Sequence, residues 1–204
     1  MQKIMFNDRY GLTNAVIDEI KNNTRRIEGG KQFQLAATAA EDFTYEEATG
    51  CIVMCCQGIE IFRHKCRYKV GEVVAVAQSY EQAYRQGNMN ADEAIIRGLK
   101  YDPGMCNKMY VRAALMPHQI RITGVRCERL QDISDEECMR EGILESWYES
   151  TDTTTYGYAD EKKETAVEFD TPREAFAALI DKVSGRGTWG CNPWVVAYEF
   201  ELVK

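Results

Sequence analysis

The spacing of apolar residues predicts a short strand and then a helix at the start of the chain. Residues 2–6 alternate weakly between apolar and polar, which is typical of a strand. Thr13 is placed to cap the following helix. The apolar face of that helix consists of Val16, Ile17 and Ile20. Lys21 then falls in the last turn of the predicted helix.

Strand-like patterns dominate the middle of the chain. An acidic break over 41–47 separates the first two β-rich stretches. Residues 79–104 have a helical and then a loop-like pattern, because glycines and a Pro-Gly pair interrupt them. The β-rich or strand-like stretches are 25–40, 51–77, 109–115 and 120–130.

Two capping boxes mark helices in the last third of the chain. Ser134-x-x-Glu137 opens a short helix that Gly142 can end, and Thr171-Pro-Arg-Glu174 opens a longer one that stops at Gly185. The apolar face of the second helix consists of Phe176, Leu179, Ile180 and Val183. The polar stretch 150–163 between them predicts a mobile excursion, and 194–202 predicts a closing strand. A mostly β chain with these helices predicts an α+β fold, a small mixed β-barrel with flanking helices.

Length and charge set limits on the class of protein. The 204 residues predict one domain spanning 1–204, and no apolar run approaches the ~18 residues that a membrane helix needs. Charged residues interrupt the N-terminus before a signal peptide could form, so we expect a cytoplasmic protein without membrane association. The net charge of −7 is concentrated in 134–170, which holds twelve acidic and three basic residues. Overall acidity therefore argues against tight nonspecific binding to duplex phosphates but does not exclude an anionic ligand.

The cysteines and histidines carry no recognisable metal-binding pattern. The eight cysteines form one cluster, Cys51-x3-Cys55-Cys56 with Cys66, which lacks the CxxC pairs of a typical zinc site. His64 and His118 show no paired ligand spacing. We therefore expect reduced, partly buried thiols, with no metal and no cofactor.

The run Lys21–Ile27 is the strongest candidate site. It sets an amine, the Thr24 hydroxyl and two guanidiniums at a helix-to-strand connection, where they can converge on a small anionic or nucleotide-like ligand. Arg25 and Arg26 are neighbours in a strand, so their side chains face opposite sides, and spacing favours Arg26 in a cleft. The alternative interpretation makes the lysine a helix-terminal cation and the threonine an ordinary strand residue.

Four segments together resemble an ASCH domain of the PUA-like superfamily, in the longer form found in bacterial and prophage genomes. The resemblance covers about half of the chain, within a single domain that has 29–66 and 143–170 as insertions. The segments are Lys21-x-x-Thr24-x-Arg26, Lys69–Val76, Arg129–Gly142 and Asn192–Phe200. The family signature is GxKxxxxR, and here Glu19 stands at the glycine position.

The resemblance implies a β-barrel whose cleft binds RNA or a modified nucleoside. Small bacterial members hydrolyse the acetyl amide of 4-acetylcytidine with a lysine, a threonine and a glutamate. By motif position these are Lys21 as base, Thr24 as nucleophile and Glu141 as proton shuttle. Glu141 also stands next to a helix-ending glycine, where the helix dipole disfavours a carboxylate.

Further ligand-binding candidates lie outside this set. Arg63, Lys65, Arg67 and Lys69 occur at alternate positions, so a strand would place four cations on one face. Such a ladder can follow an RNA backbone, or it can be a solvated face paired with acidic neighbours. Trp189, between two glycines, is a candidate cleft wall or a core residue.

Three functional hypotheses remain open at this point. The first is a cleft for RNA or a modified nucleoside, lined by Lys21, Arg26 and Glu141. The second is an amidohydrolase acting on an acylated pyrimidine nucleoside through Lys21, Thr24 and Glu141. The third is a phage-related protein-interaction module whose insertions form the functional surface.

Overall fold

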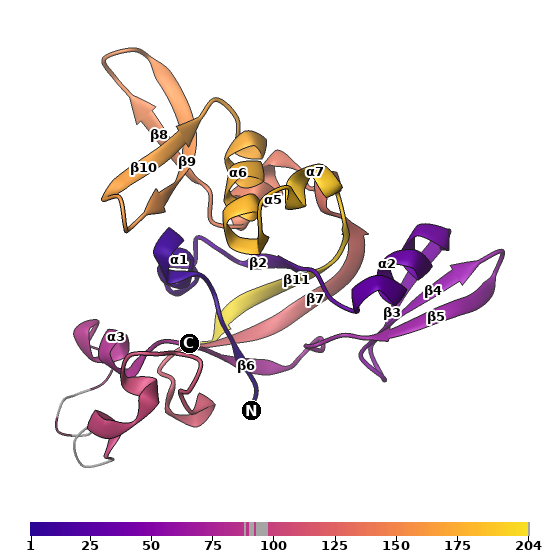
Figure 1. Cartoon of the computed structure of the whole chain (residues 1–204), viewed down its shortest axis with the longest axis horizontal. Helices are drawn as coiled ribbons and strands as arrows, with labels where there is room; N and C mark the ends of the chain where they lie inside the picture. Colours follow the sequence, from indigo (N-terminus) through magenta and orange to yellow (C-terminus); the bar gives the residue numbers. More distant parts are fainter. Residues whose placement is uncertain (88, 90–91, 93–97, 204) are drawn as a thin grey trace.

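A computed structural model describes residues 1–87, 89, 92 and 98–203 as an α+β protein with three separate sheets. The central sheet has five strands in the order β1-β6-β7-β11-β2 (Figure 1). Its strands are β1 (Lys3–Ile4), β2 (Asn23–Arg26), β6 (Val73–Val76), β7 (Gln119–Arg129) and β11 (Trp194–Val203). β1 pairs with β6 in parallel and the other pairings are antiparallel. The predicted strands 120–130 and 194–202 are confirmed.

The central sheet is open, so the predicted closed barrel is not formed. β1 and β2 are its two edge strands and have no ladder between them. They approach each other through a side chain instead, because Arg26 Nη2 donates to the Met5 carbonyl oxygen at 2.8 Å.

Two three-stranded antiparallel sheets project from different sides of the central sheet (Figure 1). They lie within 29–66 and 143–170, the two stretches expected to be insertions. The first consists of β3 (Asp42–Glu46), β4 (Cys51–Cys56) and β5 (Ile59–Lys65), and the second of β8 (Leu144–Tyr148), β9 (Thr153–Asp160) and β10 (Thr165–Phe169). The acidic break at 41–47 is thus largely strand, and most of the predicted mobile excursion at 150–163 is an ordered strand.

The helices of the described residues are of two kinds. The α-helices are α1 (Leu12–Ile17), α2 (Gly30–Ala39), α3 (Tyr80–Arg85), α5 (Asp135–Arg140), α6 (Pro172–Ser184) and α7 (Thr188–Cys191). The 3-10 helices are η1 (Asp8–Tyr10), η2 (Leu99–Tyr101), η3 (Pro103–Met105), η4 (Ala113–Leu115) and η5 (Leu130–Asp132). Among the described residues, no helix has the length and apolar character needed to cross a bilayer.

Three of the local predictions are wrong for identifiable reasons. α1 starts after Gly11, so Thr13 lies inside it and hydrogen-bonds Asp8 instead of capping. The predicted strand over 25–40 contains α2, because Phe33 and Ala37 are spaced by four residues and both are buried. No strand forms at 109–115, where a turn leads into the 3-10 helix η4. Part of the predicted helix and loop over 79–104 lies outside the described residues.

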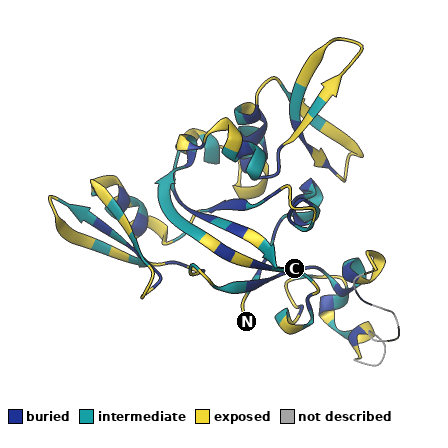
Figure 2. Cartoon of the chain, turned by 180° about the vertical axis from the view of Figure 1, so that it is seen from behind, coloured by how far each residue is buried: buried dark blue, intermediate teal, exposed yellow. Residues whose placement is uncertain are grey.

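The capping signals of the last third are confirmed. Ser134 and Glu137 form a complete capping box at the start of α5. Thr171 accepts a hydrogen bond from the Glu174 backbone at the start of α6, which ends at Gly185. The main core packs the central sheet against α6 and also includes buried residues of α2 and β4, and a second, smaller core packs around α3. The projecting sheets are exposed over much of their surface (Figure 2).

All eight cysteines are free thiols, and the buried ones make stability sensitive to alkaline pH. Burial raises the pKa of Cys138 from 9.0 to about 12. A thiol that resists ionisation in the folded state contributes its full stability below pH 9.0 and loses it as pH rises towards 12. We expect this loss to be of the order of a few kcal/mol.

The measurement is the free energy of unfolding in urea from pH 8 to pH 11 under reducing conditions. Cys138→Ala should show a shallower decline than the unaltered protein. Cys106→Ala, at an exposed thiol, is the matched control and should keep the original slope. Equal slopes for the two variants would contradict the assignment.

Candidate functional site

Lys21 is buried in the connection between α1 and β2. Its backbone N–H donates to the Ala15 carbonyl at 2.8 Å, and the next residue, Asn22, donates to the Arg140 carbonyl at 3.0 Å. These bonds attach the connection to the ends of α1 and α5. The lysine therefore lies beyond α1, not in its last turn, and its side chain is only 2% exposed.

The ammonium group of Lys21 is directed at Glu141. Nζ donates to Glu141 Oε2 at 2.5 Å and to the Glu141 carbonyl at 2.8 Å. Glu141 is the C-cap of α5, so Lys21 is a helix-terminal cation of α5 and not of α1. This contact also offsets the unfavourable position of a carboxylate at a helix C-terminus.

Gly142 allows the two chains to approach at this point. Its φ is +100°, and a Cβ there would lie 3.2 Å from Leu12 Cδ2 and 3.6 Å from Lys21 Cβ. A larger residue would be strained in that conformation and would crowd Leu12. The glycine predicted to end α5 thus also makes room for the Lys21–Glu141 contact.

Arg25 has a different role from the one its sequence position suggests. Its side chain is fully buried among three carboxylates. Nε donates to Glu128 at 2.7 Å and Nη1 to Glu141 at 3.2 Å, while Nη2 lies 3.0 Å from Glu137 in an ion pair without a hydrogen bond. The expectation that it points away from the site is wrong, because the face of β2 that carries Arg25 is the one that meets α5.

A cavity of about 320 Å³ lies beside the edge strand β2. Lys21, Thr24, Arg26 and Glu141, the four residues predicted to share a site, all line it. Arg25, the residue between Thr24 and Arg26 on β2, also lines the cavity. The remaining lining residues are Met5, Phe6, Asn7, Leu12, Ile27, Phe176, Leu179, Ile180, Val183 and Ser184.

One wall of the cavity is apolar and the other is polar. The apolar face predicted for α6 is confirmed, and its four members line the cavity. Arg26 lies near Phe6, with its guanidinium carbon 5.7 Å from the ring centroid. Its Nε is buried without a hydrogen-bond partner. Volumes of this order are typical of small-molecule sites with a few convergent polar groups.

Burial lowers the pKa of Lys21, although the Glu141 carboxylate acts in the opposite direction. The net effect is to bring the amine closer to the range in which it can accept a proton. Lys21 donates two hydrogen bonds, both to Glu141. A lysine with a lowered pKa, a carboxylate and a threonine hydroxyl in one cavity is a set suited to acid–base or nucleophilic chemistry.

The other sequence candidates do not line this cavity. Arg63 lies on β5 and is paired with Glu46 at 2.6 Å and Glu60 at 2.9 Å, so here the solvated-face alternative holds. The predicted ladder of four cations is broken because β5 ends at Lys65 and Arg67 follows it. Trp189 packs edge-on against Phe176 with ring centroids 6.0 Å apart and does not itself line the cavity.

Comparison with known protein families, curated proteins and solved structures gave no match.

One backbone feature bears on the motif GxKxxxxR described above. Glu19, at the glycine position, has a φ of +61°, a left-handed conformation that favours glycine. The described residues contain no group of three or more His, Cys, Asp or Glu side chains arranged to hold a metal ion.

Sequence reasoning missed the importance of Arg25, Glu128 and Glu137. Arg25 is more than 100 residues from both glutamates, and the three meet only when β2, β7 and α5 are assembled. The alternation of β2 indicated that Arg25 and Arg26 face opposite sides, but not which side is occupied by acidic residues. Their abundance after residue 134 was the one available signal.

Proposed function

We propose that the cavity beside β2 binds a single nucleoside, either free or unstacked from RNA. The observation that carries the proposal is the meeting of Lys21, Thr24, Arg26 and Glu141 in one cavity against an apolar wall. A planar base matches that combination, since its faces pack on apolar side chains and its edge hydrogen-bonds polar ones. The resemblance to ASCH domains supports the same ligand class.

The size of the cavity favours one base over a longer segment of nucleic acid. A volume of about 320 Å³ has no room for a duplex, and the acidic net charge works against nonspecific binding to one. The Lys21–Glu141 pair at the polar end supplies both a donor and an acceptor. Such a pair can bind the amide-bearing edge of a cytosine derivative.

Blocking the cavity provides the test of binding. Val183 lines the cavity and is 40% exposed, so Val183→Phe fills the opening without disturbing the ion pairs. We expect 4-acetylcytidine to bind the unaltered protein in isothermal titration and to bind this variant at least ~10-fold more weakly. Lys182→Phe, its exposed neighbour outside the cavity, should bind normally. Equal affinity for the two variants would contradict the assigned site.

The lowered pKa of Lys21 favours a second function, deacetylation of a 4-acetylcytidine-like nucleoside. In this mechanism the Thr24 hydroxyl attacks the acetyl carbonyl while Lys21 takes its proton. The exocyclic nitrogen leaves as the free amine after protonation, and Thr24 retains the acetyl group as an ester. Water then hydrolyses the ester and releases acetate. Glu141 orients Lys21 and shuttles protons in both steps.

A further inference from the structure

Three cations around the N-terminal segment Gln2–Phe6 lack the acidic partners that most arginines of this protein have. Carboxylates neutralise the following side chains within 4.0 Å: Arg9, Arg25, Arg63, Arg85, Arg112, Arg121, Arg126 and Arg140. Within the described part of the chain, Lys3, Arg26 and Arg67 have no such ion pair. Positive charge left uncompensated in an acidic protein marks a place where an anion can bind.

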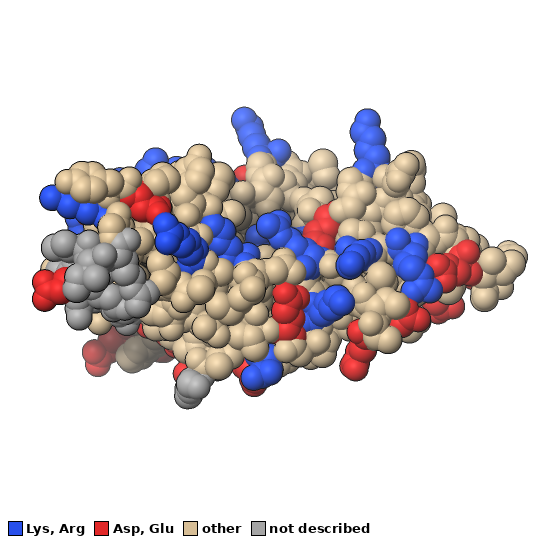
Figure 3. Space-filling model, turned by 90° about the horizontal axis from the view of Figure 1, so that it is seen from below, with Lys and Arg blue, Asp and Glu red and all other residues tan. Residues whose placement is uncertain are grey.

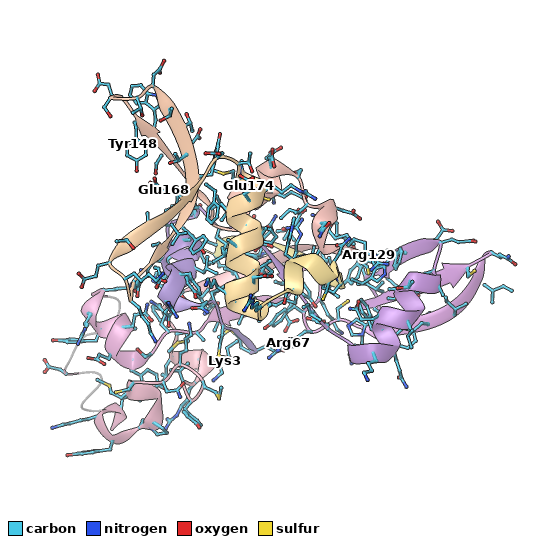
Figure 4. All side chains as sticks on the ribbon, turned by 45° about the horizontal axis from the view of Figure 1, so that its top comes forward. Lys3, Arg67, Arg129, Tyr148, Glu168 and Glu174 are labelled. Carbon is cyan, nitrogen blue, oxygen red and sulfur yellow. The ribbon has the colours of Figure 1, made fainter. Side chains whose placement is uncertain are left out.

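Direct contacts bring these three residues together around the segment Gln2–Phe6. The Tyr68 hydroxyl donates to the Lys3 carbonyl at 3.2 Å, and Gln2 Nε2 donates to the Arg67 carbonyl at 3.2 Å. Arg26 reaches the same segment through Met5. Figure 4 shows Lys3 and Arg67 close to each other below one end of α6.

Arg26 and Arg67 both act electrostatically on the Tyr68 hydroxyl. Burial raises the pKa of Tyr68, Arg67 and Arg26 lower it, and Glu28 and Glu72 act in the same direction as burial, so two cations and two carboxylates surround this group. Arg26 also lines the cavity and has a buried Nε without a partner. Arg67 is exposed, with its guanidinium carbon 5.8 Å from the Tyr68 ring centroid. Seen from below, Lys and Arg side chains form a band across this side of the molecule (Figure 3).

We propose that Arg26 and Arg67, with the charge of Lys3, form a phosphate subsite beside the cavity. The occupant is then a nucleotide, and not a free nucleoside. This inference rests on the proposed function, because it needs a nucleoside in the cavity. Guanidinium groups bind phosphate oxygens through paired N–H donors, and Arg26 still has an unpartnered one. Two Lys3 N–H bonds go to the Met109 and Val111 carbonyls, so Lys3 contributes mainly its charge.

The test compares 4-acetylcytidine with its 3′- and 5′-monophosphates by isothermal titration at low and high salt. We expect at least one monophosphate to bind ~10-fold or more tightly than the nucleoside at low salt, with the advantage shrinking as salt rises. Arg67→Gln should remove most of that advantage and leave nucleoside affinity within about twofold, since Arg67 does not line the cavity.

Arg63→Gln is the matched control, because Arg63 is an arginine of the same segment that is already paired with two glutamates. It should leave every affinity unchanged. If the nucleoside binds but neither monophosphate binds more tightly, the phosphate subsite is refuted and the proposed function survives. If Arg67→Gln weakens nucleoside and monophosphate equally, the subsite is likewise refuted. If none of the three ligands binds, the proposed function fails and this inference fails with it.

Discussion

Replacing Arg25 by methionine is expected to lower the free energy of unfolding by about 3–5 kcal/mol. The substitution leaves Glu128, Glu137 and Glu141 close together without the buried guanidinium that contacts all three. Removing this cation is costly because, among the described residues, the three carboxylates then keep only Lys21 and Arg126 as cationic partners, in a place where water solvates them poorly. Urea denaturation near neutral pH, where the carboxylates are ionised, measures this change.

Arg63→Met is the control for this prediction. Arg63 also bridges two glutamates, but its side chain is 39% exposed. Solvent screens such pairs, so this variant should lose no more than about 1 kcal/mol. A loss of the same size in Arg25→Met and Arg63→Met would show that the buried network does not stabilise the fold as described.

Replacing Lys21 by methionine is expected to reduce deacetylation by about 100-fold or more, if the protein catalyses it. The substitution keeps the apolar stem and removes the only amine that contacts Glu141 within the described residues. Because burial lowers the pKa of Lys21, the rate in the unaltered protein should rise with pH until that amine is fully neutral. Chromatographic detection of cytidine released from 4-acetylcytidine measures both effects.

Lys182→Met, which changes an exposed lysine outside the cavity, controls for the loss of a positive charge. Thr24→Val separates chemistry from binding, because it removes the proposed nucleophile and keeps its shape. It should abolish turnover while 4-acetylcytidine still binds. Unchanged turnover in Lys21→Met would refute the mechanism, and turnover absent from every form of the protein would leave binding as the function.

Local signals in the sequence were sufficient where residues close together in the chain determine the structure. The Ser134 capping box predicted the start of α5, and the spacing of Phe176, Leu179 and Ile180 predicted the buried face of α6. These signals depend on hydrogen bonds and periodicity within a few residues. They are readable without knowledge of the tertiary structure.

Features that depend on contacts between distant segments were not predictable in the same way. We expected Arg25 to point away from the site, because neighbouring residues of a strand face opposite sides. This alternation does not indicate which side of β2 packs against acidic residues. The predicted barrel does not close, because β1 has only two residues and the contact with β2 is a hydrogen bond from the Arg26 side chain to the Met5 carbonyl. Lys21 and Glu141 were paired only through the family resemblance, and their 120-residue separation gives no local signal of contact.

A crystal structure of the protein with bound 4-acetylcytidine is the most direct test of the proposed cavity. We predict that the base lies between Phe6 and the apolar face of α6, with its amide-bearing edge at Lys21 and Glu141. Ligand density on either projecting sheet, with the cavity beside β2 left unoccupied, would contradict the account.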